Sequence, residues 1–79
     1  MNDNVLLERI EVNPKILVGK PIIRGTRISV ELILSLLADG WSFEDIQRNY
    51  PRVTPEDIRA CIAYANEMVQ DWKLYAARG

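Results

Sequence analysis

The second half of the chain repeats one arrangement of apolar and polar positions three times. In each copy an apolar residue precedes a Ser or Thr, and an isoleucine stands four positions after that hydroxyl residue, at 28–33, 41–46 and 53–58. A hydroxyl side chain can cap a helix by accepting a hydrogen bond from a free backbone N–H, and apolar residues at N′ and N4 form a hydrophobic staple. The arrangement predicts helices over most of residues 29–77.

The three predicted helices differ in length. The first, 30–39, has an apolar stripe at helical spacing and stops at Gly40, a residue favoured just past a helix end. The second, 43–49, is ended by a proline two residues later. The third starts at Pro55 and continues to Lys73 or beyond. Its apolar stripe is formed by Ile58, Cys61, Ile62, Ala65, Val69 and Trp72.

The first third of the chain has the pattern of strands and turns. Residues 9–12 alternate with period two, and short apolar runs at 16–18 and 22–23 are separated by Asn, Gly and Pro. This pattern therefore predicts β segments, such as a hairpin, in residues 9–28. Residues 1–8 are expected to be a flexible end. The expected fold class is mainly α: a three-helix helix-turn-helix core with a short N-terminal β hairpin, in a single domain of 79 residues.

The third predicted helix is longer than two short helices can cover. About 20 residues of helix extend roughly 30 Å. Its C-terminal part is therefore a candidate partner-binding surface, formed by Met68, Trp72, Leu74 and Tyr75. The alternative is that Trp72 folds back on the N-terminal strands.

Composition fits a small globular domain, with 48% hydrophobic and 27% charged residues. A chain this short buries only about 60% of its unfolded surface, so association with a partner or a second copy would stabilise it. Cys61 is its one cysteine, which excludes an internal disulfide and fits a reducing compartment. The N-terminus has no signal-peptide pattern, and no apolar run is long enough to span a membrane. We expect a cytoplasmic protein.

The net charge of −1 does not favour nucleic-acid binding, but its distribution is uneven. Residues 1–28 carry five basic and three acidic side chains, so a phosphate-facing surface would include this part of the chain. Glu56 and Asp57 oppose DNA contact, because they stand at the start of the candidate recognition helix, Pro55 onward. The candidate DNA contacts are Lys20, Arg24, Arg27, Arg48 and Arg52, with Thr54 and Arg59 secondary.

Each of these charged groups also has a structural interpretation. Arg24 and Arg27 stand in a run with two glycines and two isoleucines, and could tie the hairpin to a helix carboxylate such as Glu31. The acids at 56 and 57 could simply cap the third helix.

Catalysis has little support in the sequence. Histidine, the commonest general base, is absent, and Cys61 lies on an apolar stripe. The acidic pairs 44–45 and 56–57 could suggest a metal-dependent nuclease, but adjacent residues diverge on a helix. We therefore predict no catalytic residue, metal site, cofactor or small-molecule substrate.

Several motifs in the run from Ile10 to Tyr64 resemble a large family of small prokaryotic proteins catalogued as a domain of unknown function. They are Asn13-Pro14, the segments 19–28 and 40–46, Tyr50-Pro51 and the segment 54–60. The family is grouped with helix-turn-helix folds and VapB-type antitoxins of type II toxin–antitoxin modules.

The resemblance implies an antitoxin-like homodimer that neutralises a PIN-like ribonuclease toxin and binds operator DNA. The alternative is a protein–protein interaction module that does not bind DNA.

Overall fold

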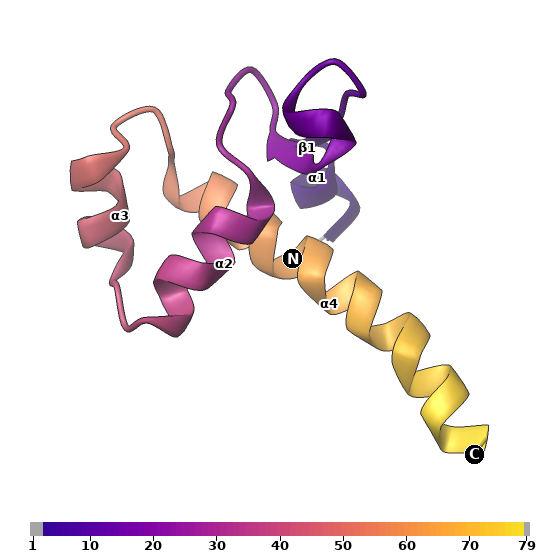
Figure 1. The fold of residues 1–79 in the computed structure, drawn as a ribbon. Coiled ribbons are helices and arrows are strands. Elements are labelled where there is room, and N and C mark those ends of the chain that lie inside the picture. The colour runs from indigo at the N-terminus through magenta and orange to yellow at the C-terminus, as the bar shows by residue number, and fades with distance from the viewer. Residues whose placement is uncertain (1–2, 79) are drawn as a thin grey trace.

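The computed structural model describes the backbone of residues 3–78 and the side chains of residues 5–70. Its regular elements follow in the order α1 (Asp3–Leu7), β1 (Ile10–Val12), β2 (Pro21–Ile23), α2 (Val30–Ala38), α3 (Phe43–Asn49) and α4 (Pro55–Arg78) (Figure 1). This order confirms a helix-rich fold with a small two-stranded sheet. The predicted bounds of α2 and α3 and the start of α4 agree to within one residue.

The sheet is an antiparallel hairpin with Ile10 opposite Ile23 and Val12 opposite Pro21. The apolar run 16–18, which was expected to be a β segment, is instead part of the reversal between the strands. Two of its residues have a left-handed backbone, with φ of 49° at Leu17 and 54° at Val18. Because β1 and β2 already pair with each other, this run has no strand to join in the hairpin.

The prediction of a flexible N-terminal end is wrong for residues 3–7, which form α1. Leu6 is only 8% exposed and packs against Ala60 and Ala63 of α4. The small side chains on that face of α4 let the short helix approach closely. This contact joins residues more than 50 positions apart, so the local pattern held no sign of it.

All three predicted helix caps are present. The hydroxyl oxygens of Ser29, Ser42 and Thr54 each accept a hydrogen bond from the backbone N–H three residues later, at 3.0, 3.0 and 3.1 Å. Asp45 and Asp57 complete two capping boxes, because each carboxylate accepts a hydrogen bond of 3.0 Å from the backbone N–H of its capping residue. The local sequence therefore determines where these helices begin.

The main core lies among α2, α3, α4 and the hairpin. Ile33, Ile46 and Ile58, the N4 residues of the three staples, are fully buried in one cluster. Their staple partners belong to or pack against the same cluster: Ile28, Trp41 and Val53. The staples thus hold each helix at its entrance and also supply the centre of the core.

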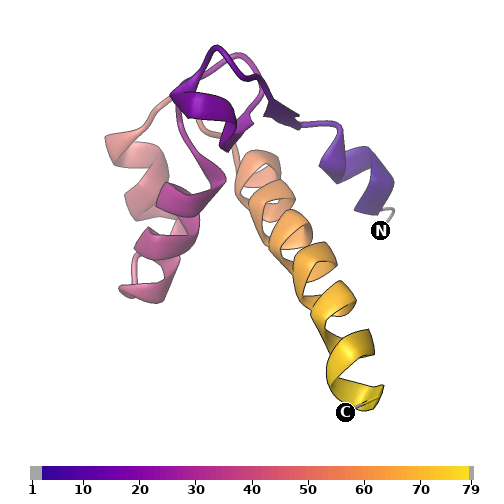
Figure 2. The same ribbon diagram turned by 45° about the vertical axis from the view of Figure 1, so that its right-hand side comes forward.

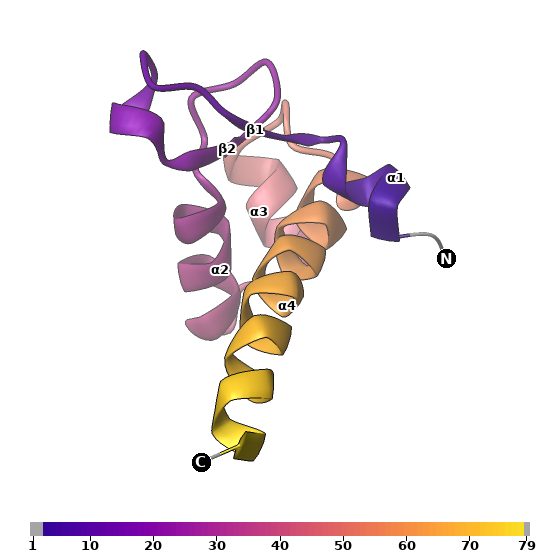
Figure 3. The same cartoon turned by 90° about the vertical axis from the view of Figure 1, so that its right-hand side faces the viewer.

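Helix α4 is the longest element, with 24 residues and a length of about 36 Å. Its first turns lie beside α1, α2 and the hairpin, whereas its last turns extend beyond them (Figures 2 and 3). The expected surplus of helix is therefore present. That α2, α3 and α4 work as a helix-turn-helix stays a prediction.

Candidate functional site

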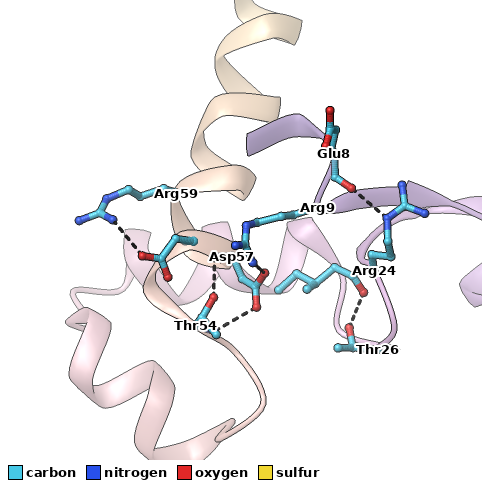
Figure 4. Close-up of polar contacts among 9 residues, drawn as sticks. Glu8, Arg9, Arg24, Thr26, Thr54, Asp57 and Arg59 are labelled. Atoms are coloured by element: carbon cyan, nitrogen blue, oxygen red, sulfur yellow. Dashed lines mark hydrogen bonds and ion pairs between the residues drawn. The ribbon is translucent and has the colours of Figure 1, made fainter. Parts of the chain in front are cut away.

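The start of α4 is organised around the buried carboxylate of Asp57, whose side chain is 10% exposed. One oxygen accepts a hydrogen bond from Arg9 Nη1 at 3.1 Å, and the other accepts one from the Thr54 backbone N–H at 3.0 Å (Figure 4). This carboxylate therefore joins Arg9, the residue just before β1, to the first turn of α4. Sequence reasoning found Thr54 as a cap but missed Arg9, which has no local signal because it is 48 residues away from Asp57.

The acidic pairs that could suggest a nuclease do not come together. Asp45 caps α3 and Asp57 caps α4, and each belongs to a separate capping box. Among the residues the structure describes, no group of three or more His, Cys, Asp or Glu side chains is arranged to hold a metal ion.

A basic loop, residues 24–27, follows β2 at the end of the molecule where α4 begins (Figure 1). Arg24 Nε donates to the carbonyl oxygen of Glu8 at 2.9 Å, and Thr26 Oγ1 donates to the carbonyl oxygen of Ile23 at 2.7 Å (Figure 4). Gly25 has a φ of +80°, which favours glycine, and a Cβ there would meet no atom within 4 Å. The loop is therefore held by hydrogen bonds from its own side chains to backbone carbonyl groups on either side of it.

Arg52 brings this loop to the segment that precedes α4. Its Nη2 donates to the carbonyl oxygen of Gly25 at 3.2 Å. The structure thereby places Arg24, Arg52 and Thr54 around the N-terminal end of α4, with Arg27 exposed in the same loop. No acidic residue occurs between Gly19 and Val30. This loop and Arg52 form the basic end of the molecule.

The other predicted DNA contacts lie elsewhere and pair with acids. Lys20 donates to Glu31 of α2 at 2.8 Å, so Lys20 makes the hairpin-to-helix ion pair that was considered for Arg24 and Arg27. Arg48 lies 3.2 Å from Asp45, and Arg59 lies 3.9 Å from Glu56; the Arg59 pair projects from the side of α4 away from Arg24 (Figure 4). The seven predicted DNA contacts therefore do not form one continuous patch.

Two of these ion pairs affect carboxyl groups. The hydrogen bond and charge of Lys20 lower the pKa of Glu31. The hydrogen bonds from Ser42 hold the pKa of Asp45 below its ordinary value, with a smaller contribution from Arg48. Both acids thus stay ionised at neutral pH and reduce the positive potential beside their cations.

A second surface is an open apolar groove of about 640 Å³ between α2 and α4, which we call the α2–α4 groove. Its walls are mostly aliphatic, and Met68 and Val69 at its outer edge are 51% and 53% exposed. Met68, one predicted partner contact, is therefore exposed at the edge of this groove, and its role in partner binding stays a prediction. The other three, Trp72, Leu74 and Tyr75, have side chains outside the described residues. The main lining residues are Val30, Leu34, Ser35, Ala38, Ala65, Met68 and Val69.

Cys61 is enclosed in the core and fully buried. Burial raises the pKa of its thiol to about 12, with a further contribution from the nearby Asp57 carboxylate. A thiol in this state is a poor nucleophile, which agrees with its expected role as a small core residue.

Together these features define the class of protein: a helix-rich domain with a two-stranded sheet, a basic end and an open apolar groove. Within this class, the chain belongs to a family described as Protein of unknown function (DUF433), whose model matches residues 10–65. The family resemblance noted from the motifs is therefore confirmed at this level, and the antitoxin assignment stays a prediction.

Two relatives extend the comparison. The crystal structure of a DUF433 member protein from Anabaena variabilis ATCC 29413 is similar, with a TM-score of 0.75, 27% identity, and coverage of 94% of this chain and 73% of that chain. The uncharacterized protein y4eO of Sinorhizobium fredii (strain NBRC 101917 / NGR234) is 36% identical over 58 residues. That match covers 73% of this chain but 26% of y4eO, so the chain spans about a quarter of that relative.

A membrane-crossing helix is not found among the described residues, since none of their helices is both long and apolar enough.

Proposed function

We propose that this protein is a non-catalytic, antitoxin-like component of a type II toxin–antitoxin system. It would neutralise a PIN-like ribonuclease and, as a homodimer, bind operator DNA. The observation that carries the proposal is the open apolar face of α4 beyond Tyr64, where Met68 and Val69 are each about half exposed. These residues border the open apolar groove between α2 and α4, and a contiguous exposed apolar patch of this kind marks an interaction site in many proteins.

The basic end supports the DNA-binding part of the proposal. Arg24 and Arg27 belong to a loop that contains no acidic residue, and Arg52 joins this loop to the segment just before the candidate recognition helix. Arginine suits phosphate because its planar guanidinium can donate two parallel hydrogen bonds. In this arrangement the loop would contact the DNA backbone, and Thr54 would lie at the edge of the contact.

The DNA test compares two single charge removals. Arg27→Gln removes an exposed cation of the basic end, and Lys15→Gln removes an exposed cation of the hairpin reversal. If the basic end contacts phosphate, Arg27→Gln reduces the slope of log affinity against log salt by about one for the protein's own promoter DNA. Lys15→Gln leaves that slope unchanged. Equal slopes for the wild type and both variants would remove the basic end from the DNA surface.

The proposal predicts that a neighbouring gene encodes a PIN-like ribonuclease, and the toxin test uses that enzyme with its ribonuclease activity as the readout. Met68→Glu places a charge on the apolar face of α4, whereas Asn66→Glu adds the same charge on an exposed position that does not line the groove. We expect Met68→Glu to weaken inhibition at least tenfold and Asn66→Glu to leave it within about twofold. Full inhibition by Met68→Glu would exclude this face as the toxin site.

The second candidate function is a protein-interaction module that does not bind DNA. It is favoured by the acid–base pairs Arg48–Asp45 and Arg59–Glu56, which offset the arginines of the candidate helix-turn-helix, whose two helices each contain one more acidic than basic residue. This candidate predicts toxin binding with no salt-dependent affinity for promoter DNA.

A further inference from the structure

The two outer edges of the β hairpin have different surroundings. Across the hairpin the Arg24 N–H donates to the Arg9 carbonyl oxygen at 2.8 Å, and the next pair is Ile10 opposite Ile23. Hydrogen-bonded and non-hydrogen-bonded pairs alternate in an antiparallel ladder, so Ile10 and Ile23 point their backbone groups away from the hairpin. On the β2 side this edge is used, because the Ile23 N–H donates to the Ile28 carbonyl oxygen at 2.9 Å.

The outer edge of β1 has no such neighbouring strand. In the part of the chain that the structure describes, the sheet consists of β1 and β2. By the same alternation, the backbone N–H and C=O groups of Ile10 and Val12 point outward. β1 contains neither proline nor lysine, two residues that commonly protect an exposed edge from pairing. The outer edge of β1 is therefore open to another extended chain.

A hollow of about 300 Å³ lies beside this edge, between β1 and α4, and we call it the β1–α4 hollow. β1 runs above α4 there, with α1 next to the start of β1 (Figure 3). Val12 is 57% exposed, although it shares a strand face with Ile10, which packs against the core. The apolar face of the hairpin thus continues past the core into the hollow. The lining residues are Leu7, Ile10, Val12, Tyr64, Glu67 and Met68.

We propose that the outer edge of β1 binds an extended segment of another protein, which adds to the hairpin as a third strand. An added strand lies about 4.8 Å from its neighbour and is held by main-chain hydrogen bonds, while pockets for its alternate side chains give specificity. Its inward side chains lie over the β1–α4 hollow, because the side chains of Ile10 and Val12 line it. The segment that fits alternates apolar and polar residues, with the apolar ones inward.

The backbone of β1 specifies that the occupant is a strand. Outward N–H and C=O groups at every second residue match the free groups of another strand, whereas a helix pairs its own backbone groups internally. β1 has three residues and extends about 10 Å, so main-chain pairing supplies only a few hydrogen bonds. The side chains in the hollow must therefore contribute to the affinity, and a short segment is sufficient to cover the site.

Glu67 selects the charge of the segment. It is the one charged residue that lines the hollow, and it is exposed. The sequence has no basic residue within four positions of Glu67 on either side, and none of the ion pairs among the described residues includes it. A basic side chain at the end of the bound segment would compensate this charge, so we expect a segment with lysine or arginine next to its apolar positions.

This site depends on neither the toxin nor the DNA of the proposed function. It lies on the β1 side of α4, and only Tyr64 and Met68 also border the α2–α4 groove. Its test therefore uses the isolated full-length chain and a synthetic peptide, so that its result is separate from the DNA and toxin assays.

The first experiment follows the backbone amides of the isotope-labelled chain by NMR. The probe is the peptide Lys-Thr-Val-Thr-Val-Thr-Lys, whose valines and lysines share one face in either direction of binding. In the free protein the outward amides of Ile10 and Val12 should exchange with solvent quickly. Millimolar peptide should shift the signals of these two amides and slow their exchange at least severalfold.

The second experiment changes only the backbone of the probe. One peptide is N-methylated at its two valines and a second at its last two threonines, which removes N–H donors from opposite edges of the strand. Because a strand pairs through one edge, one of these peptides should bind at least about tenfold more weakly than the unmodified probe. The other should bind about as well, since its methyl groups point away from β1.

The third experiment tests the charge of the site. Glu67→Gln removes the carboxylate from the hollow, and Glu44→Gln removes an exposed carboxylate from α3 as a matched control. Glu67→Gln should weaken binding of the lysine-ended probe by about twofold to fivefold, as expected for an exposed ion pair, and Glu44→Gln should leave it unchanged. Equal binding to both variants overturns the requirement for a basic residue.

Shifts at Ile10 and Val12 together with loss of binding for one methylated peptide support the added strand, whatever the DNA and toxin assays give. No change at these amides in millimolar peptide overturns it, and so does an equal effect of the two methylation patterns. Slow exchange of both amides in the free protein overturns it as well, because the edge would then already be covered, for example by a second copy.

Discussion

The two halves of α4 share one helix but have opposite surroundings. In the first half Ile58, Ala60 and Cys61 are fully buried against α1, α2, α3 and the hairpin. In the second half Met68 and Val69 are about half exposed, although they continue the same apolar spacing. The comparison teaches that helical periodicity identifies an apolar face, whereas the presence of neighbours decides whether that face is core or binding surface.

The largest contrast is expected from truncating an apolar side chain in each half. Ile58→Ala leaves a cavity at the centre of the core, so the free energy of unfolding should fall by roughly 2–5 kcal/mol. Val69→Ala should change it by less than about 0.5 kcal/mol when measured on the monomer at low concentration. Urea denaturation followed by circular dichroism measures both. Similar losses for the two variants would contradict the division of α4 into a buried and an open half.

The reactivity of a thiol distinguishes the two halves of α4, and for Cys61 it needs no change to the core. With the pKa of Cys61 raised to about 12 from an ordinary 9.0, its thiolate fraction at neutral pH is about a thousandfold lower than that of a free thiol. Cys61 should therefore react with Ellman's reagent at least that much more slowly in the native protein, and at the ordinary rate in denaturant. A cysteine introduced as Val69→Cys should react quickly in the monomer. Rapid labelling of native Cys61 would show that the first half of α4 opens easily.

The buried carboxylate of Asp57 joins the start of α4 to Arg9 in the N-terminal part of the chain. Asp57→Ala removes the cap of α4 and the partner of Arg9, so we expect a loss of about 1–3 kcal/mol in unfolding free energy. Glu56→Ala, at the neighbouring exposed position, should cost less than about 0.5 kcal/mol. Thermal or urea unfolding provides the measurement. A cost for Glu56→Ala equal to that for Asp57→Ala would exclude the buried carboxylate as the specific tie.

The smallest effect is expected at α3, whose cap is exposed. The folded pKa of Asp45 is lowered from 3.8, chiefly by the hydrogen bond from the Ser42 backbone. Because the pKa of Asp45 is lower in the folded state, the ionised carboxylate stabilises the fold. This contribution to stability is fully present above pH 3.8 and is lost as the pH falls through the folded pKa. Asp45→Ala, which removes this carboxylate, should thus destabilise the protein slightly at pH 7, and the difference from wild type should shrink in acid. An effect that grows as the pH falls would contradict this sign.

Local signals allowed several parts of this structure to be predicted. The caps at Ser29, Ser42 and Thr54 act over three residues, and the stop at Gly40 acts over five. At that stop Gly40 has a φ of +94°, and the Trp41 N–H donates to the Leu36 carbonyl oxygen at 3.0 Å. Because these interactions connect near neighbours, the identity of a few adjacent residues is sufficient to predict them.

The candidate site was predicted less well, because its arrangement depends on distant contacts. Lys20, and neither Arg24 nor Arg27, pairs with Glu31, and the choice follows from where the hairpin meets α2. Arg52 reaches Gly25 across 27 residues, which assembles the basic end. A pattern of charges along the chain names the candidates but holds no information about which of them become neighbours.

By itself the amino-acid sequence determined the starts of α2, α3 and α4, the stops of α2 and α3, the isoleucines of the core and the surplus length of the last helix. Only the tertiary structure decided that residues 3–7 form a helix on α4, that Arg9 reaches Asp57, and that α2 and α4 leave a groove open. The physical reason is range. Caps, staples and glycine stops are completed within one or two helical turns, whereas packing and long-range ion pairs exist only after distant segments have been brought together.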